Sequence, residues 1–206
     1  QMVRCLLAVA FLVPLSFLLD AGKCSMKESL AKWKNPRLWK ASICCGVSLF
    51  AASSLQQIGL VYTDAGKAGF ITAMYIVLTP VVGLLRGRKA PRLTVFSVAV
   101  AVVGLYLISC MGATGINKGD LFLMGCALAF AVQINCVDHF CEGLDGFRMN
   151  CIQALTVAVI SAPCVFFTET VDMGNLLACW GPLCFAGCLS MGIAYSLQIV
   201  GQKEIE

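Results

Sequence analysis

Long apolar segments alternate with short polar connections along the whole chain. A hydrocarbon core of about 30 Å requires about 20 residues of α-helix to cross it. Seven segments approach or exceed this length, although the first is short for a full span. They are 2–19, 38–61, 67–85, 93–110, 120–137, 147–167 and 176–200. The pattern predicts an all-α polytopic membrane protein.

Composition supports this prediction and narrows the chemistry. Apolar residues make up 59% of the chain and charged residues 13%, whereas soluble domains average about 45–50% and about 25%. The net charge is +4, and no basic patch is interleaved with aromatic residues, so we expect no nucleic-acid partner. The 13 cysteines form no CxxC pair, and about ten of them lie inside apolar runs with no histidine at ligand spacing. We interpret them as apolar filler and expect neither a metal nor a cofactor.

The positive charges predict the orientation in the membrane. If segment 2–19 enters the cytoplasm, 12 Lys and Arg residues lie on the cytoplasmic side and three, Arg4, Lys67 and Lys118, lie outside. Cytoplasmic loops carry the excess of Lys and Arg. We therefore expect the 20–40 loop and the C-terminus to be cytoplasmic. The cytoplasmic set is Lys23, Lys27, Lys32, Lys34, Arg37, Lys40, Arg86, Arg88, Lys89, Arg92, Arg148 and Lys203.

One 12-residue motif occurs twice. Residues 48–59, SLFAASSLQQIG, and residues 190–201, SMGIAYSLQIVG, are identical at six positions. The copies lie on the second and the seventh segments, five spans apart, and an odd separation reverses the direction of the chain through the membrane. The repeat therefore predicts two inverted halves, with a solute site near the midplane between them.

The repeated glutamines are the first candidates for a solute pathway. Gln56 and Gln198 occupy the same motif position, and a buried amide is costly unless it faces protein or water. The alternative is a structural hydrogen bond between helices. A second candidate is the stripe of Thr72, Tyr75 and Thr79, which ends at Pro80, where we expect the helix to bend. Its alternative is hydroxyl groups bonded to their own helix, with the tyrosine packed in the bundle.

Three further polar residues, Gln133, Asn135 and Tyr195, lie within apolar segments. Each is a candidate for the solute pathway, and the alternative is a structural hydrogen-bonding role. No Asp, Glu or Lys lies at the centre of a segment, so the sequence identifies no coupling ion.

Several stretches resemble EamA-type carriers of the drug/metabolite transporter superfamily. Residues 53–80, SSLQQIGLVYTDAGKAGFITAMYIVLTP, resemble the third and fourth helices, residues 104–109 with 118–120 resemble the fifth helix and the start of the second repeat, and residues 193–202 resemble the eighth helix. The resemblance implies an inner-membrane secondary carrier of ten helices in a 5+5 inverted repeat, moving small metabolites or drugs by alternating access.

The resemblance also implies how this chain is divided. Seven of the ten helices are present: helices 2–5 in a partial first repeat, residues 1–110, and helices 6–8 in a partial second repeat, residues 118–206. The implied partners are a small-molecule solute, the lipid bilayer and a possible second copy in a homodimer.

Three other classes of protein are alternatives to a carrier. A truncated, inactive fragment stays open. A seven-helix receptor or retinal protein would not need an inverted repeat, and segment 176–200 has no central lysine for a Schiff base. An enzyme is disfavoured because no HExxH, GxSxG or paired-aspartate motif is present.

Overall fold

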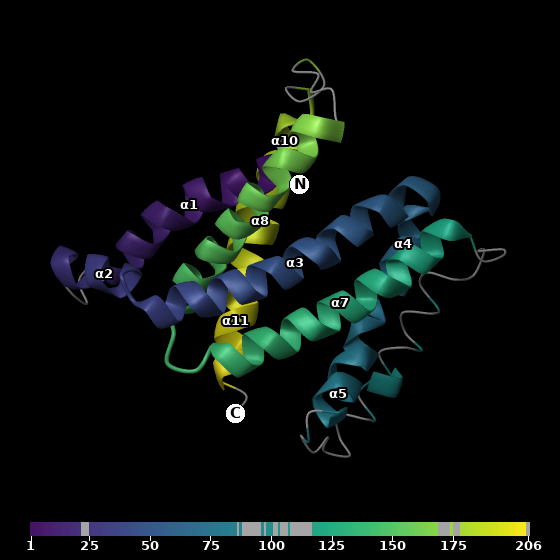
Figure 1. Cartoon of the computed structure of the whole chain (residues 1–206), viewed down its shortest axis with the longest axis horizontal. Coiled ribbons are helices and arrows are strands. Elements are labelled where there is room, and N and C mark those ends of the chain that lie inside the picture. The colour runs from purple at the N-terminus through teal and green to yellow at the C-terminus, as the bar shows by residue number, and fades with distance from the viewer. Residues whose placement is uncertain are drawn as a thin grey trace. The chain divides into compact units, whose positions relative to one another are not determined.

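Helices form all the regular structure in the described part of the chain. The computed structural model (Figure 1) describes residues 1–21, 25–85, 87, 96, 98–100, 103, 107, 117–168, 174 and 178–204. The elements are α1 (Met2–Asp20), α2 (Met26–Trp33), α3 (Pro36–Tyr62), α4 (Ala65–Ala73), α5 (Tyr75–Leu85), α7 (Lys118–Phe140), α8 (Gly146–Thr168), α10 (Trp180–Cys184), the π-helix η1 (Phe185–Ala194) and α11 (Tyr195–Glu204).

Six stretches of the described chain are long and apolar enough to cross a membrane. They are Met2–Asp20, Pro36–Tyr62, Ala65–Leu85, Lys118–Phe140, Gly146–Val165 and Trp180–Lys203. The prediction of an all-α polytopic membrane protein is confirmed. The remaining predicted segment, 93–110, lies mostly outside the described residues. The basic positions Arg86, Arg88, Lys89 and Arg92 also lie outside them. The 5+5 inverted repeat stays a prediction.

Three local expectations are corrected. The 20–40 region is not a simple loop: α2 forms within it, and a reciprocal capping box between Ser25 and Glu28 starts the helix. The predicted span 67–85 is broken at Met74, whereas Pro80 lies inside α5. The backbone N–H of Met74 donates to the carbonyl oxygen of Ile71 (3.2 Å), which gives a tightened turn at this point. The turn comes two residues before Ile76, whose carbonyl group the ring of Pro80 crowds.

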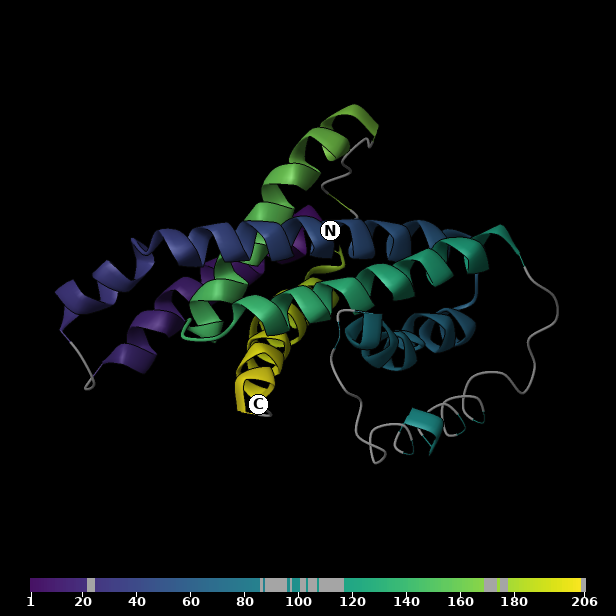
Figure 2. The same cartoon turned by 60° about the horizontal axis from the view of Figure 1, so that its bottom comes forward.

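The described chain divides into two compact units. Unit 1 comprises Gln1–Phe50 and Val137–Glu206, and unit 2 comprises Ala51–Cys136. In unit 1, α1, α8, η1 and α11 pack on one another (Figures 1 and 2). Residues spaced three and four apart supply the core on α1, because this spacing places them on one helix face. They are Cys5, Ala8 and Leu12, all fully buried.

Unit 2 consists of the end of α3 with α4, α5 and α7. Helices α3 and α7 run side by side here, and their backbones approach closely (Figures 1 and 2). A Cβ atom on Gly59 would lie 2.6 Å from Cγ of Leu123, and one on Gly119 would lie 2.8 Å from the carbonyl oxygen of Gly59. Two glycines therefore permit this contact, as small residues do between membrane helices.

Candidate functional site

Both repeated glutamines lie in helices and are half-buried. Gln56 lies in α3 within unit 2, and its neighbour Gln57 is exposed. Gln198 lies in α11 within unit 1. Each glutamine thus belongs to a different unit.

The predicted stripe on segment 67–85 faces α7, but its polar groups are partly occupied. The Thr79 hydroxyl donates to the carbonyl oxygen of Tyr75 in its own helix (2.7 Å). The Tyr75 ring packs on Phe130, with ring centroids 5.9 Å apart. Thr72 is buried, and its hydroxyl lies beside the Cys126 thiol. Thr79 and Tyr75 therefore have the contacts of the structural alternative, in which the hydroxyl bonds to its own helix and the tyrosine packs in the bundle.

Two amides of α7 turn into unit 2. Gln133 is 1% exposed and Asn135 is 5% exposed. The Nδ2 of Asn135 donates to the carbonyl oxygens of Thr79 (3.0 Å) and Ala131 (2.8 Å). The Asn135 amide thus links α7 to α5 at the predicted polar stripe, and the structure brings Tyr75, Thr79 and Asn135 together.

The second motif copy lies where the helix changes its pitch. Its first residues belong to the π-helix η1, and Tyr195 opens α11. Such stretches are rare and leave carbonyl groups in need of donors. Asn150, fully buried on α8, supplies them: its Nδ2 donates to the carbonyl oxygens of Met191 (2.8 Å) and Gly192 (3.1 Å) and to the hydroxyl of Ser196 (2.9 Å).

Tyr195 and Gln198 are half-buried neighbours of this contact. The sequence analysis missed Asn150. The signal that could have identified it is an amide within an apolar segment, the argument applied to the glutamines.

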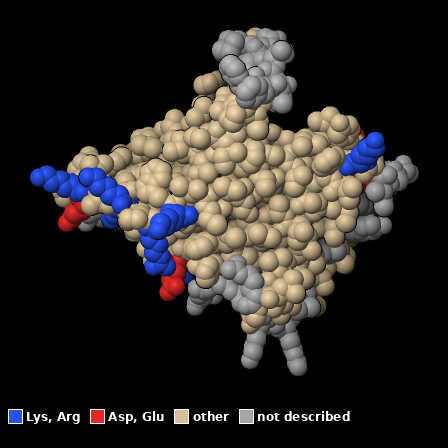
Figure 3. Space-filling view, viewed as in Figure 1, with Lys and Arg blue, Asp and Glu red and all other residues tan. Residues whose placement is uncertain are grey.

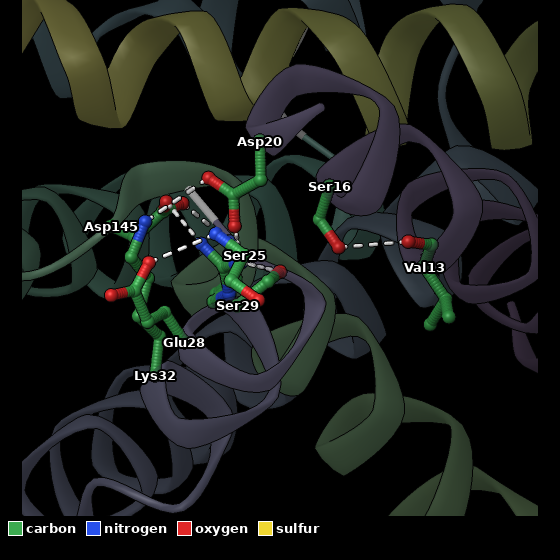
Figure 4. A network of polar contacts seen from close by, with 9 residues as sticks. Val13, Ser16, Asp20, Ser25, Glu28, Ser29, Lys32 and Asp145 are labelled. Carbon is green, nitrogen blue, oxygen red and sulfur yellow. Dashed lines mark hydrogen bonds and ion pairs between the residues drawn. The ribbon is translucent and has the colours of Figure 1, made fainter. Parts of the chain in front are cut away.

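A buried arginine organises the polar end of unit 1. The Arg148 side chain is 1% exposed and donates to the carboxylates of Asp20 and Asp145 (2.6 Å) and to the Ser29 hydroxyl (2.9 Å). Lys32 pairs with the same Asp20 carboxylate at 3.1 Å (Figure 4). These contacts join the end of α1, helix α2 and the start of α8.

An aromatic side chain completes the surroundings of the arginine. The Arg148 guanidinium lies over the Trp33 ring, 5.7 Å from its centroid, a cation–π geometry. The sequence analysis counted Arg148 only as one of the loop cations, because charge counting says nothing about burial.

Unit 2 has a smaller polar network at the start of α7. Asn117 and Asp120 form a reciprocal capping box: the N–H of Asn117 donates to Asp120 (2.9 Å), and the N–H of Asp120 donates to Asn117 (3.0 Å). Thr63 donates to the Asp120 carboxylate (3.1 Å), and Lys67 pairs with it at 2.5 Å. The network fastens the end of α3 and the start of α4 to the start of α7.

Among the described residues, no group of three or more His, Cys, Asp or Glu side chains could hold a metal ion. The arrangement offers amides, hydroxyls and aromatic rings within apolar helices. Such groups are able to form hydrogen bonds with a polar solute.

Comparisons with known proteins agree with this architecture. An uncharacterized transporter of Archaeoglobus fulgidus is 34% identical over 126 residues, which is 61% of this chain and 40% of that protein. The chain thus matches less than half the length of this relative. A solved crystal structure is similar with a TM-score of 0.73 at 17% identity, over 98% of this chain and 70% of its own. The EamA-like transporter family matches residues 1–110 and 117–206. The chain is a polytopic membrane protein of the EamA-like transporter family.

Proposed function

We propose that this chain carries seven of the ten helices of a secondary transporter that moves small polar metabolites or drugs by alternating access. The proposed halves are 1–110 and 118–206, inverted with respect to one another. In such carriers the solute site lies near the midplane between the repeats and is exposed alternately to each side.

One observation carries the proposal: the two copies of the motif each place a glutamine that is half-buried in a helix. Gln56 and Gln198 are neither fully packed nor fully exposed, as a group that contacts a transient solute needs to be. Tyr195 lies beside the second glutamine on α11. Thr72 and Gln133 add polar groups in unit 2, and Thr79 and Tyr75 contribute through their contacts with α7.

Matched substitutions test the glutamines. The full-length protein is reconstituted in liposomes, and solutes that stabilise it saturably against heat are offered in a counterflow assay. We expect Gln56→Leu and Gln198→Leu each to lower the initial uptake rate at least about tenfold, the effect of about 1.4 kcal/mol. The control is Gln57→Leu, one residue along α3 and exposed, which should retain uptake within about twofold. Equal uptake by all three variants, at equal yield, would remove the glutamines from the pathway.

Orientation is tested separately. We propose an inner-membrane location with the 20–40 region and the C-terminus in the cytoplasm. Lys27 is exposed on α2, so Lys27→Cys, in a background without the exposed native cysteines, should react with an impermeant maleimide only after the cells are opened. Labelling in intact cells would reverse the proposed orientation.

A further inference from the structure

A basic pocket lies at the polar end of unit 1, and neither glutamine of the repeated motif lines it. Its volume is about 330 Å³, and its lining comes from α2, the α2–α3 connection, the start of α3, the α7–α8 connection, the start of α8 and the end of α11. The lining residues are Lys32, Asn35, Leu38, Gly143, Leu144, Asp145, Arg148 and Lys203.

The pocket has more positive than negative charge. Three of its lining side chains are cationic, Lys32, Arg148 and Lys203, against one carboxylate, Asp145. Counting also Asp20, which pairs with Lys32 and Arg148, leaves an excess of one positive charge. Among the described side chains of this cluster, the cations therefore exceed the carboxylates by one, and an anion would balance the charge.

Several hydrogen-bond donors belong to residues that line this space. The ammonium group of Lys203 donates to the carbonyl oxygen of Leu144 (2.7 Å), and an ammonium group has three N–H bonds. The Arg148 side chain is 1% exposed, and its Nε has no hydrogen-bond partner among the described residues. A buried guanidinium N–H without an acceptor is costly. A tetrahedral phosphate, with several acceptor oxygens, suits donors that arrive from different helices better than a planar carboxylate does.

The backbone shapes one wall of the pocket. Gly143 has φ +71°, a left-handed conformation that favours glycine. The turn there brings the N–H of Leu144 to the carbonyl oxygen of Cys141 (3.0 Å). A Cβ atom on Gly146, at the start of α8, would lie 3.0 Å from Cγ2 of Val200. The starts and ends of these helices are therefore held close, which fixes the spacing of the donors.

The neighbouring helix has the character of a membrane-surface segment. On α2, Met26 is 70% exposed and Leu30 is 52% exposed, while Lys27 and Lys32 lie on the same short helix. Trp39, 39% exposed, follows on α3. Lys and Arg side chains gather over this part of the molecule, at the left of Figure 3. Exposed apolar residues with lysines and tryptophans are typical of segments at the depth of lipid headgroups.

We propose that this pocket binds the phosphate group of an anionic, phosphate-bearing ligand through Lys203, Lys32 and Arg148. A basic pocket between membrane helices at headgroup depth matches the chemistry of an anionic phospholipid. A soluble phosphate ester offers the same group. None of the proposed pathway residues lines this pocket, and the proposal does not depend on them.

A stability titration tests the site and distinguishes the two sources. The purified protein in neutral detergent is titrated with phosphatidylglycerol, phosphatidylcholine or glycerol 3-phosphate, and the thermal unfolding midpoint is followed. We expect phosphatidylglycerol to raise the midpoint saturably by several degrees and phosphatidylcholine to have a much smaller effect. If glycerol 3-phosphate raises the midpoint in the same way, the ligand is a soluble phosphate ester. If only phosphatidylglycerol raises it, the ligand is a lipid headgroup.

Three variants make the test specific. Lys203→Gln and Lys32→Gln should each weaken the apparent affinity for the active ligand about fivefold, the loss of one charge-assisted hydrogen bond. Lys27→Gln is the matched control: it removes the same charge from α2, but it does not line the pocket. Each shift is measured against the same variant without ligand, so a change in basal stability does not affect the comparison. Equal weakening by all three variants would mean diffuse surface attraction and would overturn the proposal, as would the lack of any saturable shift. Because no transport is measured, this result is independent of the pathway test.

Discussion

The two units hold their buried charges in different ways. In unit 1, the Arg148 side chain is 1% exposed and binds two carboxylates that come from α1 and from the start of α8. In unit 2, the Asp120 side chain is 4% exposed and meets one cation, Lys67, which is itself 17% exposed. Asp120 also accepts hydrogen bonds from Thr63 and from the backbone of Asn117. The charge network of unit 1 thus depends on a fully enclosed cation, whereas the buried carboxylate of unit 2 also has neutral hydrogen-bond donors.

The two copies of the motif also differ in the contacts that their matching residues make. Gly59 of the first copy lies against Leu123, whereas its counterpart Gly201 has open space around its Cβ position. Ser54 is half-buried, whereas its counterpart Ser196 is fully buried and bonded to Asn150. Identical residues at matching positions therefore serve different contacts, because the neighbouring helices differ.

The largest expected effect separates the two charge networks. Arg148→Met should destabilise the protein by about 3–5 kcal/mol, because two carboxylates lose their enclosed partner. Lys67→Met should cost about 1–2 kcal/mol, because Asp120 keeps its neutral donors. The measurement is unfolding in detergent, followed by heat or by denaturant. Similar losses in the two variants would show that enclosure of the cation does not set its contribution.

The glycines of the motif give the next largest contrast. Gly59→Ala should destabilise the protein by about 1–3 kcal/mol, because the added methyl group would overlap with Leu123. Gly201→Ala should be neutral or stabilising by up to about 1 kcal/mol, since alanine favours a helix and nothing blocks the methyl group. Both are measured by the same unfolding assay. A tolerated Gly59→Ala would mean that α3 and α7 separate at little cost.

The serines of the motif give the smallest contrast. Ser196→Ala removes an acceptor of the Asn150 amide and should cost about 1 kcal/mol. Ser54→Ala, at a half-buried site, should cost less than about 0.5 kcal/mol. Amide hydrogen exchange in η1 checks the cause: exchange at 185–194 should quicken in Ser196→Ala and stay unchanged in Ser54→Ala. Unchanged exchange in both variants would mean that the Ser196 hydroxyl does not stabilise the π-helix η1.

The sequence predicted the helices well because the bilayer imposes one simple rule. A spanning segment must be apolar and must satisfy its own backbone, so run length and composition locate α1, α3, α7 and α8 to within a few residues. Stretches such as 53–80 showed the resemblance to the EamA family, and the match over residues 1–110 and 117–206 establishes it. The pathway residues stay a prediction: the structure brings Asn135 to the carbonyl group of Thr79, and the Thr79 hydroxyl is bonded to its own helix.

The chain by itself determined which segments enter the membrane, because hydrophobicity is a property of each segment alone. Only the tertiary structure decided which polar residues become partners. Arg148 looks like any loop cation until α1 and α2 bring Asp20 and Ser29 to it. Asn150 looks like any intramembrane amide until η1 presents its carbonyl groups. The tightened turn at Met74 likewise lies in a continuous apolar run, where local sequence offers only Pro80 as a signal. Such pairings depend on residues far apart in the chain, and burial gives them their energetic weight.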